Sequence, residues 1–352
     1  MISVNVNASK AYEIVIGENI LANAGNMISK VTSAKKAVVI TDDIVEKLYF
    51  ETVNSSLKNS NFEVLKYVIP NGEQSKNGQQ YLEICEFLAE NHITKSDIIV
   101  ALGGGVVGDL SGFVAATFLR GISFVQIPTT LLAAVDSSVG GKTAIDLKNG
   151  KNLVGSFYQP KLVICDYLTL NTLEKNIFVD GCAEVIKYAV IGNKKLFNHL
   201  VKNGLDFDRE YVISECVKMK RDIVEKDEFD KGERQKLNLG HTVGHSIEAC
   251  SNFKISHGSA VAIGLAIISR AALKKGICDK KNVDDILNVL KEFDLPIDTE
   301  FSANDLYDVA LSDKKRSGNS LNIIIPYEVG DSRIKTIEIN QLIDYIEAGI
   351  WI

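Results

Sequence analysis

The chain has 352 residues, enough for two domains with well-buried cores. Its 39 Lys and Arg against 45 Asp and Glu give a net charge of −6, which argues against non-specific binding to nucleic acid. No stretch is apolar for long enough to span a bilayer, and the N-terminus alternates like a strand hairpin, unlike a signal peptide. Six scattered cysteines without a CxxC pair are typical of a reduced chain, so we expect a cytoplasmic protein that binds neither membrane nor nucleic acid.

The first half of the chain alternates strand and helix patterns. Helical patterns separate short apolar runs that predict buried strands at 37–42, 62–70, 97–102, 123–130 and 161–166. This alternation predicts a mostly parallel sheet covered by helices, and we interpret residues 1–170 as a Rossmann-like α/β domain that binds a dinucleotide. Ligands of such sheets bind at the carboxyl ends of the strands.

A glycine-rich turn follows the strand at 97–102. Gly103, Gly104 and Gly105 precede a helix that runs to about Leu119, so the backbone can approach a diphosphate while the helix N-terminus offers N–H donors. The alternative is a tight strand–helix turn without a ligand. Residues 71–76 and 129–130 also follow strands, where a dinucleotide could bind.

A polar connection rich in glycine comes next, from Asp136 through Lys142 to Asn152. Lysines among glycines are common in solvated loops, which is one interpretation. The other is a set of cations directed at an anionic ligand.

From about residue 171 the pattern is helical, and we expect an all-α domain over residues 171–352 that binds metal and substrate. Its tail, around residues 321–326, predicts a short hairpin strand and a closing helix. Within the apolar segment 180–191, Glu184 and Lys187 share a helix face at i, i+3. A buried carboxylate needs a partner, which is either Lys187 or a metal ion.

Three of the five histidines lie close together in the sequence. His241 and His245 are four residues apart and share a helix face, and His257 opens an apolar helix over residues 260–275. Such a pair can be an ordinary surface or core feature. Zinc-like cations, however, bind neutral imidazole, and a catalytic zinc site uses three protein ligands. Gly240 and Gly244 keep this face open, which favours metal binding.

With these motifs the chain resembles the 3-dehydroquinate synthase family of sugar-phosphate cyclases. The resemblance runs roughly from residue 37 to 325 and rests on the motifs NGEQ, GGGVVGD, PTTLLA, VDSSVGGKT, GSFYQP, AEVIKY and GHT. It implies a dehydroquinate synthase-like fold with an N-terminal dinucleotide-binding domain and a helical C-terminal domain. It also implies a carbon–oxygen lyase that converts 3-deoxy-D-arabino-heptulosonate 7-phosphate to 3-dehydroquinate and phosphate, using NAD and one divalent metal ion, zinc or cobalt.

The resemblance also implies the site residues. The metal ligands would be Glu184, His241 and His257. The NAD contacts would be Asn71, Gly72, Glu73, Gln74, Ser75, Lys76, Gly105, Val106, Val107, Gly108, Asp109, Thr129, Thr130, Lys142, Lys151, Thr169, Leu170, Asn171 and Thr172. The substrate contacts would be Arg120, Asp136, Lys142, Asn152, Lys187, Lys220, Arg234, Asn238 and His245, joined by Lys314 or Lys315 at the phosphate.

Arg120 stands at the far end of the helix that begins at the glycine turn. Such a helix spans roughly 20 Å at 1.5 Å per residue, so the family role of Arg120 at the phosphate predicts a homodimer in which it serves the partner's site. The alternative is a cation placed favourably at a helix C-terminus.

Three other functions fit parts of the pattern. A metal-dependent polyol dehydrogenase shares the glycine turn, but a plain alcohol needs no lysine set such as that around residues 140–152. A sister cyclase, such as 2-deoxy-scyllo-inosose or valiolone synthase, has a substrate without a carboxylate, whereas Lys220 and Arg234 favour one with a carboxylate. A non-catalytic, metal-stabilised binding protein is the third.

Overall fold

A computed structural model describes residues 1–314 and 319–350 of the chain, and the side chains within residues 1–311 and 319–350. The chain forms two compact units. Unit 1 comprises Met1–Leu173 and Arg209–Phe229, and unit 2 comprises Glu174–Asp208 and Asp230–Ile352. The sequence predicted a single boundary after residue 170, whereas the structure groups residues 209–229 with unit 1.

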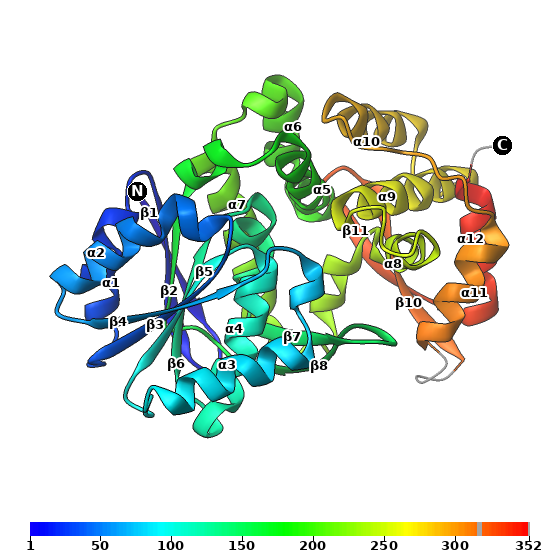
Figure 1. The fold of residues 1–352 in the computed structure, drawn as a ribbon. Coiled ribbons are helices and arrows are strands. Elements are labelled where there is room, and N and C mark those ends of the chain that lie inside the picture. Colours follow the sequence, from blue (N-terminus) through cyan, green and yellow to red (C-terminus); the bar gives the residue numbers. More distant parts are fainter. Residues whose placement is uncertain (315–318, 351–352) are drawn as a thin grey trace. The chain divides into compact units, whose positions relative to one another are not determined.

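Unit 1 is built on a seven-stranded sheet with the order β1-β2-β9-β6-β5-β3-β4 (Figure 1). Its strands are β1 (Ile2–Asn7), β2 (Ala11–Gly17), β3 (Lys36–Asp42), β4 (Glu63–Ile69), β5 (Ile98–Gly103), β6 (Ser123–Pro128) and β9 (Leu162–Asp166). Only the β1–β2 pair is antiparallel. The predicted opening hairpin and mostly parallel sheet are therefore confirmed.

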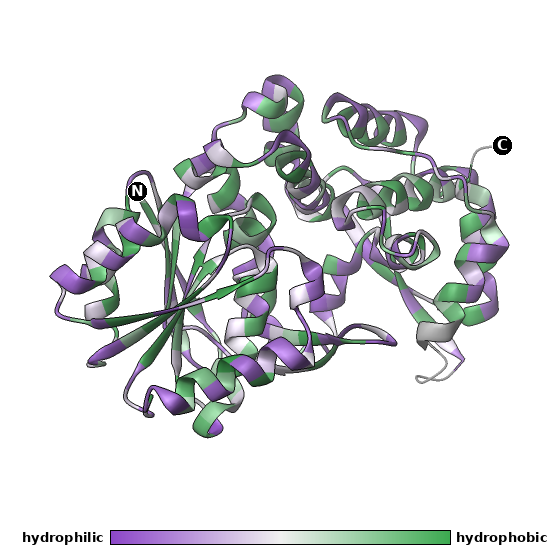
Figure 2. Cartoon of the chain, viewed as in Figure 1, coloured by the Kyte–Doolittle hydropathy of each residue, from purple (hydrophilic) through white to green (hydrophobic). Residues whose placement is uncertain are grey.

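Helices cover both faces of this sheet. The helices of unit 1 include α1 (Ala24–Ser29), α2 (Glu51–Asn59), α3 (Gly78–Glu90), α4 (Gly105–Thr117) and α7 (Arg209–Lys226). Alternate residues of β3 point to opposite faces, so Val39 packs in the core beneath α1 and α2 while Val38 packs beneath α3 and α4. Because both faces are covered, the inner strands β5 and β9 are buried along their whole length, and most of the inner part of the sheet is coloured hydrophobic in Figure 2.

A second, two-stranded sheet lies outside the main sheet of unit 1. It consists of β7 (Lys142–Leu147) and β8 (Gly150–Phe157), which pair antiparallel. Strand β7 packs against α4. The segment that the sequence left open as a solvated loop is thus partly a hairpin, and it contains three of the candidate site residues.

Unit 2 is mainly helical. Its helices are α5 (Lys175–Gly192), α6 (Lys194–Asn203), α8 (His241–Cys250), α9 (His257–Lys274), α10 (Lys280–Glu292), α11 (Ala303–Lys314) and α12 (Leu342–Gly349). Helix α9 is buried almost all round and packs against α5, α8, α10 and α12. The expected tail hairpin is present as β10 (Ser320–Glu328) and β11 (Asp331–Glu338), so unit 2 contains strands as well as helices.

Helices α8 and α9 pack unusually closely. A Cβ atom on Gly264 of α9 would lie 2.1 Å from the carbonyl oxygen of Gly240 and 2.9 Å from the backbone nitrogen of Gly244. Gly240 itself has φ +79°, a conformation that favours glycine. These three glycines let the N-terminal turn of α8 pack closely against the first half of α9, and each of those helices begins with a histidine.

In the part of the chain that the structure describes, no helix combines the length and apolarity needed to cross a membrane.

Candidate active site

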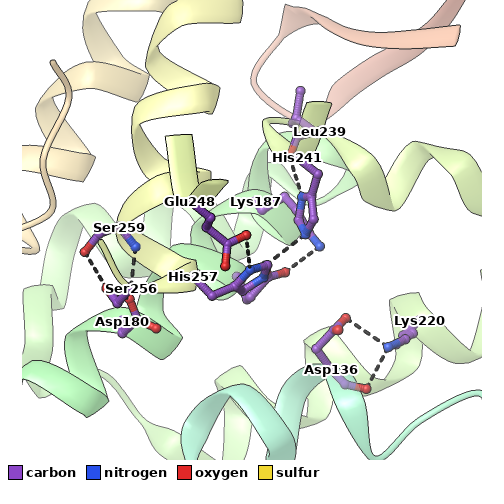
Figure 3. A network of polar contacts seen from close by, with 11 residues as sticks. Asp136, Asp180, Lys187, Lys220, Leu239, His241, Glu248, Ser256, His257 and Ser259 are labelled. Atoms are coloured by element: carbon purple, nitrogen blue, oxygen red, sulfur yellow. Dashed lines mark hydrogen bonds and ion pairs between the residues drawn. The ribbon is translucent and has the colours of Figure 1, made fainter. Parts of the chain in front are cut away.

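Three candidate metal ligands converge in unit 2. Glu184 comes from α5. His241 is the first residue of α8 and His257 is the first residue of α9, and both rings are labelled in Figure 3. The Oε1 atom of Glu184 lies 3.4 Å from Nε2 of His241 and 3.3 Å from Nε2 of His257. The ligand atoms of the three residues all lie within 4.8 Å of one another.

In each of the two imidazole rings, the nitrogen that points away from Glu184 is Nδ1, and it contacts a hydrogen-bond acceptor. Nδ1 of His241 lies 3.1 Å from the carbonyl oxygen of Leu239, and Nδ1 of His257 lies 3.4 Å from Oε2 of Glu248. Both partners are acceptors, so Nδ1 of each ring can carry a proton while Nε2 offers its lone pair to a metal ion. In that state two lone pairs and a carboxylate oxygen face one another, an arrangement that suits a cation. The residues therefore fit a zinc-type site with two histidines and one glutamate.

Charge compensation at this centre involves Lys187. Its ammonium group pairs with Oε2 of Glu184, and both side chains are almost completely buried. Burial raises the pKa of Glu184, but Lys187 and the histidines outweigh it and hold the pKa well below its usual value. Burial, together with the charge of Lys187, lowers the pKa of His241.

The imidazole of His257 lies between two carboxylates, which favour a positive charge on the ring. Burial lowers its pKa, but hydrogen bonds and charges from Glu184 and Glu248 outweigh this and raise the pKa to about 10. A proton on its ring thus satisfies the two carboxylates where no metal ion is bound. Of the two partners that the sequence offered for Glu184, Lys187 is in contact with one carboxylate oxygen. The other oxygen faces the two histidines, and its metal ion stays a prediction.

The remaining candidate residues of unit 2 differ in how far they are exposed. His245 is exposed on α8, and its ring centroid lies 5.4 Å from that of His241 and 6.2 Å from that of His257. Arg234 and Asn238 belong to the short helix Glu233–Asn238, where Arg234 is buried and Asn238 exposed. Lys315 and the side chain of Lys314 lie outside the described residues.

In unit 1 the predicted nucleotide residues collect at the carboxyl ends of the parallel strands. The order of the strands reverses between β3 and β5, because β4 lies on the other side of β3. Residues 103–105 follow β5 at this switch point, where ligands of such sheets bind. Residues 71–76, 129–130 and 169–172 follow β4, β6 and β9 at the same edge.

The glycine turn has little room for side chains. A Cβ on Gly103 would lie 2.6 Å from the side chain of Val107, and one on Gly104 would lie 3.0 Å from Thr130. Helix α4 starts at Gly105, so residues 105–107 lie in its first turn and present backbone N–H groups at the sheet edge. This geometry fits a diphosphate held by a helix N-terminus.

Lys76 connects three parts of this edge. Its ammonium group donates to Oδ2 of Asp109 at 2.6 Å and to Oδ1 of Asn152 on β8 at 2.6 Å. Burial lowers the pKa of Lys76, but Asp109 and Glu73 outweigh it and raise the pKa. Lys142 begins β7 and is exposed, while Lys151 on β8 is half-buried.

A second ion pair places Lys220 in unit 1. Lys220 on α7 donates to the carbonyl oxygen of Asp136 at 2.7 Å and lies 2.9 Å from its carboxylate.

Two further candidate positions differ in exposure. Arg120 follows α4, is exposed and has φ +65°. Thr169 is buried, and its carbonyl oxygen accepts a hydrogen bond from the hydroxyl of Tyr49 at 3.1 Å.

Comparison with known proteins decides the family. The family profiles described as 3-dehydroquinate synthase N-terminal and 3-dehydroquinate synthase C-terminal match residues 66–180 and 181–316. The 3-dehydroquinate synthase of Clostridium acetobutylicum is 44% identical over 342 residues, which cover 96% of each chain. The chain belongs to the 3-dehydroquinate synthase family. The resemblance seen in the sequence, and the lyase class that it implied, are thereby confirmed.

Solved structures agree on the fold of this synthase. The 2-epi-5-epi-valiolone synthase of Streptomyces hygroscopicus, solved with NAD⁺ and Zn²⁺, has a TM-score of 0.89 at 22% identity and covers 98% of each chain. A 2-deoxy-scyllo-inosose synthase, solved with carbaglucose-6-phosphate, NAD⁺ and Co²⁺, has a TM-score of 0.87 at 23% identity, covering 99% of this chain and 100% of its own. The predicted two-part fold is confirmed.

Sequence reasoning missed one buried group beside the candidate metal ligands. Glu248 on α8 contacts His257 but does not appear among the predicted site residues. A signal for it was present, since Glu248 lies seven residues after His241 and three after His245, and these spacings place all three on one helix face. The roles of the predicted residues remain predictions.

Proposed function

We propose that this synthase converts 3-deoxy-D-arabino-heptulosonate 7-phosphate to 3-dehydroquinate and phosphate with NAD in unit 1 and one zinc or cobalt ion at Glu184, His241 and His257. The observation that carries the proposal is the convergence of these three ligand atoms in a chain of this family. When bound, the metal ion would supply Lewis acidity at a substrate hydroxyl, and NAD would accept one hydride and later return it.

The charged and polar side chains are assigned to parts of the substrate by their chemistry. Arg234 has the planar guanidinium group that grips a carboxylate through two parallel hydrogen bonds, so we assign it to the substrate carboxylate. Lys142, Lys187, Lys220 and Asn152 supply cationic and polar contacts to the anionic substrate. Neutralising the phosphate helps it to depart in the β-elimination that follows oxidation.

His245 is our candidate for proton transfer at a substrate hydroxyl. It is exposed on α8 beside the ligand rings, and an imidazole exchanges protons near neutral pH. Asp136, whose carboxylate lies 2.9 Å from the ammonium group of Lys220, is our candidate for orienting a hydroxyl. Ring opening and an aldol closure would then form the carbocycle, and the cofactor would end in the oxidised form in which it bound.

Two finer features belong to this proposal. We expect a cytoplasmic enzyme, because all six cysteines are free thiols. We also expect a homodimer in which the exposed Arg120 serves the partner's substrate phosphate.

Metal removal tests the proposal. Exhaustive chelation should abolish phosphate release, and added zinc or cobalt should restore it in the wild type but not in His241→Ala. Full activity of demonstrably metal-free protein would overturn the metal assignment.

A further inference from the structure

The imidazole of His257 lies between two buried carboxylates. Its Nε2 is 3.3 Å from Oε1 of Glu184, and its Nδ1 is 3.4 Å from Oε2 of Glu248 (Figure 3). Glu184 and Glu248 are both almost fully buried. One carboxylate belongs to the proposed ligand set, whereas the other contacts the opposite nitrogen of the ring.

The two proposed histidine ligands are oriented by different means. The ring of His241 is held by the backbone carbonyl of Leu239, two residues before it, which no side-chain substitution removes. The ring of His257 is held by a side chain from another helix, since Glu248 is on α8 and His257 begins α9. A ring that can rotate about its side-chain bonds binds a metal ion less tightly than a ring held in place. The orientation of the His257 ring depends on the side chain of Glu248, and a substitution of Glu248 can therefore weaken it.

A carboxylate can only accept a hydrogen bond. With a metal ion on the side of Glu184 and His241, the contact with Glu248 holds the proton of His257 on Nδ1 and leaves the lone pair of Nε2 for the ion. The negative charge of Glu248 also makes Nε2 a stronger donor to a cation.

We infer that Glu248 is a positioning residue of the metal centre, which fixes the ring orientation and tautomer of His257. The inference rests on the proposed metal site. A competing arrangement is a second ion held by His245, Glu248 and His257, whose ligand atoms also lie within 4.8 Å of one another. It would require His257 to give up the proton on Nδ1, and it makes Glu248 a ligand.

The affinity of the full-length enzyme for zinc, measured after its metal has been removed with a chelator, distinguishes a positioning role of Glu248 from a ligand role. We would measure it by competition with a chromophoric chelator for the wild type, Glu248→Leu, Glu248→Gln and His257→Ala, with the exposed Glu292→Gln of α10 as a control. Glu248→Leu should weaken zinc binding by about 10–100-fold. Glu248→Gln, whose side-chain carbonyl can accept the same bond, should recover most of that loss, and the control should match the wild type.

Melting of the metal-free proteins provides the second readout. A positioning role predicts that Glu248→Leu melts close to the wild type without metal but gains less from added zinc, because stabilisation by a ligand falls with its affinity. Wild-type zinc affinity in Glu248→Leu would overturn the inference. So would a loss in Glu248→Gln as large as that in Glu248→Leu.

The outcomes also distinguish the inference from the proposed metal site. If His257→Ala binds zinc like the wild type, the proposed site itself is wrong. If His257→Ala loses zinc while Glu248→Leu keeps it, only the positioning role fails. Two zinc ions per wild-type chain, falling to one in Glu248→Leu, would make Glu248 a ligand and likewise overturn the inference.

Discussion

Replacing Lys187 with methionine tests the charge balance of the metal centre. The substitution keeps an unbranched side chain but removes the ammonium group that pairs with Oε2 of Glu184. Each of these two side chains is about 1% exposed, so the carboxylate left behind has little access to water. Removing one partner of a buried ion pair costs about 3–5 kcal/mol. The cost is nearer the lower end of this range where Glu184 takes up a proton, because the buried carboxyl group is then neutral.

This loss converts into a measurable change in melting temperature. A domain of 150–250 residues loses about 2–4 °C per kcal/mol, so metal-free Lys187→Met should melt roughly 6–20 °C below the metal-free wild type. Zinc at the other oxygen of Glu184 restores a positive charge beside the carboxylate. The gap between variant and wild type should therefore narrow when both are saturated with zinc.

Scanning calorimetry at one fixed scan rate, on chelated and zinc-saturated samples, measures both gaps. Lys281→Met is the control, because its pair with Asp285 on α10 is exposed and should barely affect melting. Equal melting of metal-free Lys187→Met and wild type would refute the argument from burial. A gap that zinc leaves unchanged would show that the ion does not bind beside Glu184.

Three further substitutions test other parts of the account. Arg234→Ala should cost about 2–5 kcal/mol of transition-state stabilisation on the heptulosonate phosphate and far less on a carboxylate-free analogue; equal losses would make Arg234 structural. Mixing inactive Arg120→Ala with inactive Lys187→Ala subunits should restore roughly a quarter of wild-type activity on random exchange, and no recovery after proven exchange would exclude a shared site. Gly264→Ala should cost at least about 1–3 kcal/mol and weaken zinc binding, because its Cβ would lie 2.1 Å from the carbonyl oxygen of Gly240; unchanged melting would contradict this packing argument.

The sequence predicted those parts of the fold that depend on local patterns. The apolar runs at 37–42 and 97–102 correspond to β3 and β5. Both faces of the sheet are covered there, so residues 37–42 and 98–103 are all buried. The i, i+3 spacing of Glu184 and Lys187 likewise required only a helix to bring the two side chains together.

Features that depend on distant contacts were not visible in the sequence. The β7–β8 hairpin lies outside the main sheet and contains polar residues at its turn, so its pattern resembled a loop. Helix α7 joins unit 1 through contacts with β1 and with the segment that contains Asp136, which lies 84 residues before Lys220. Glu248 was overlooked because its role depends on His257, which belongs to the next helix.

The central claim is that NAD is needed but not consumed while phosphate is eliminated. The most direct measurement incubates the zinc- or cobalt-loaded enzyme with the heptulosonate phosphate and a small, known amount of NAD. Released phosphate and nicotinamide absorbance are followed together. The account predicts many phosphates released per NAD and no net accumulation of NADH. NADH formed in proportion to substrate consumed, without phosphate release, would instead identify a dehydrogenase and contradict the account.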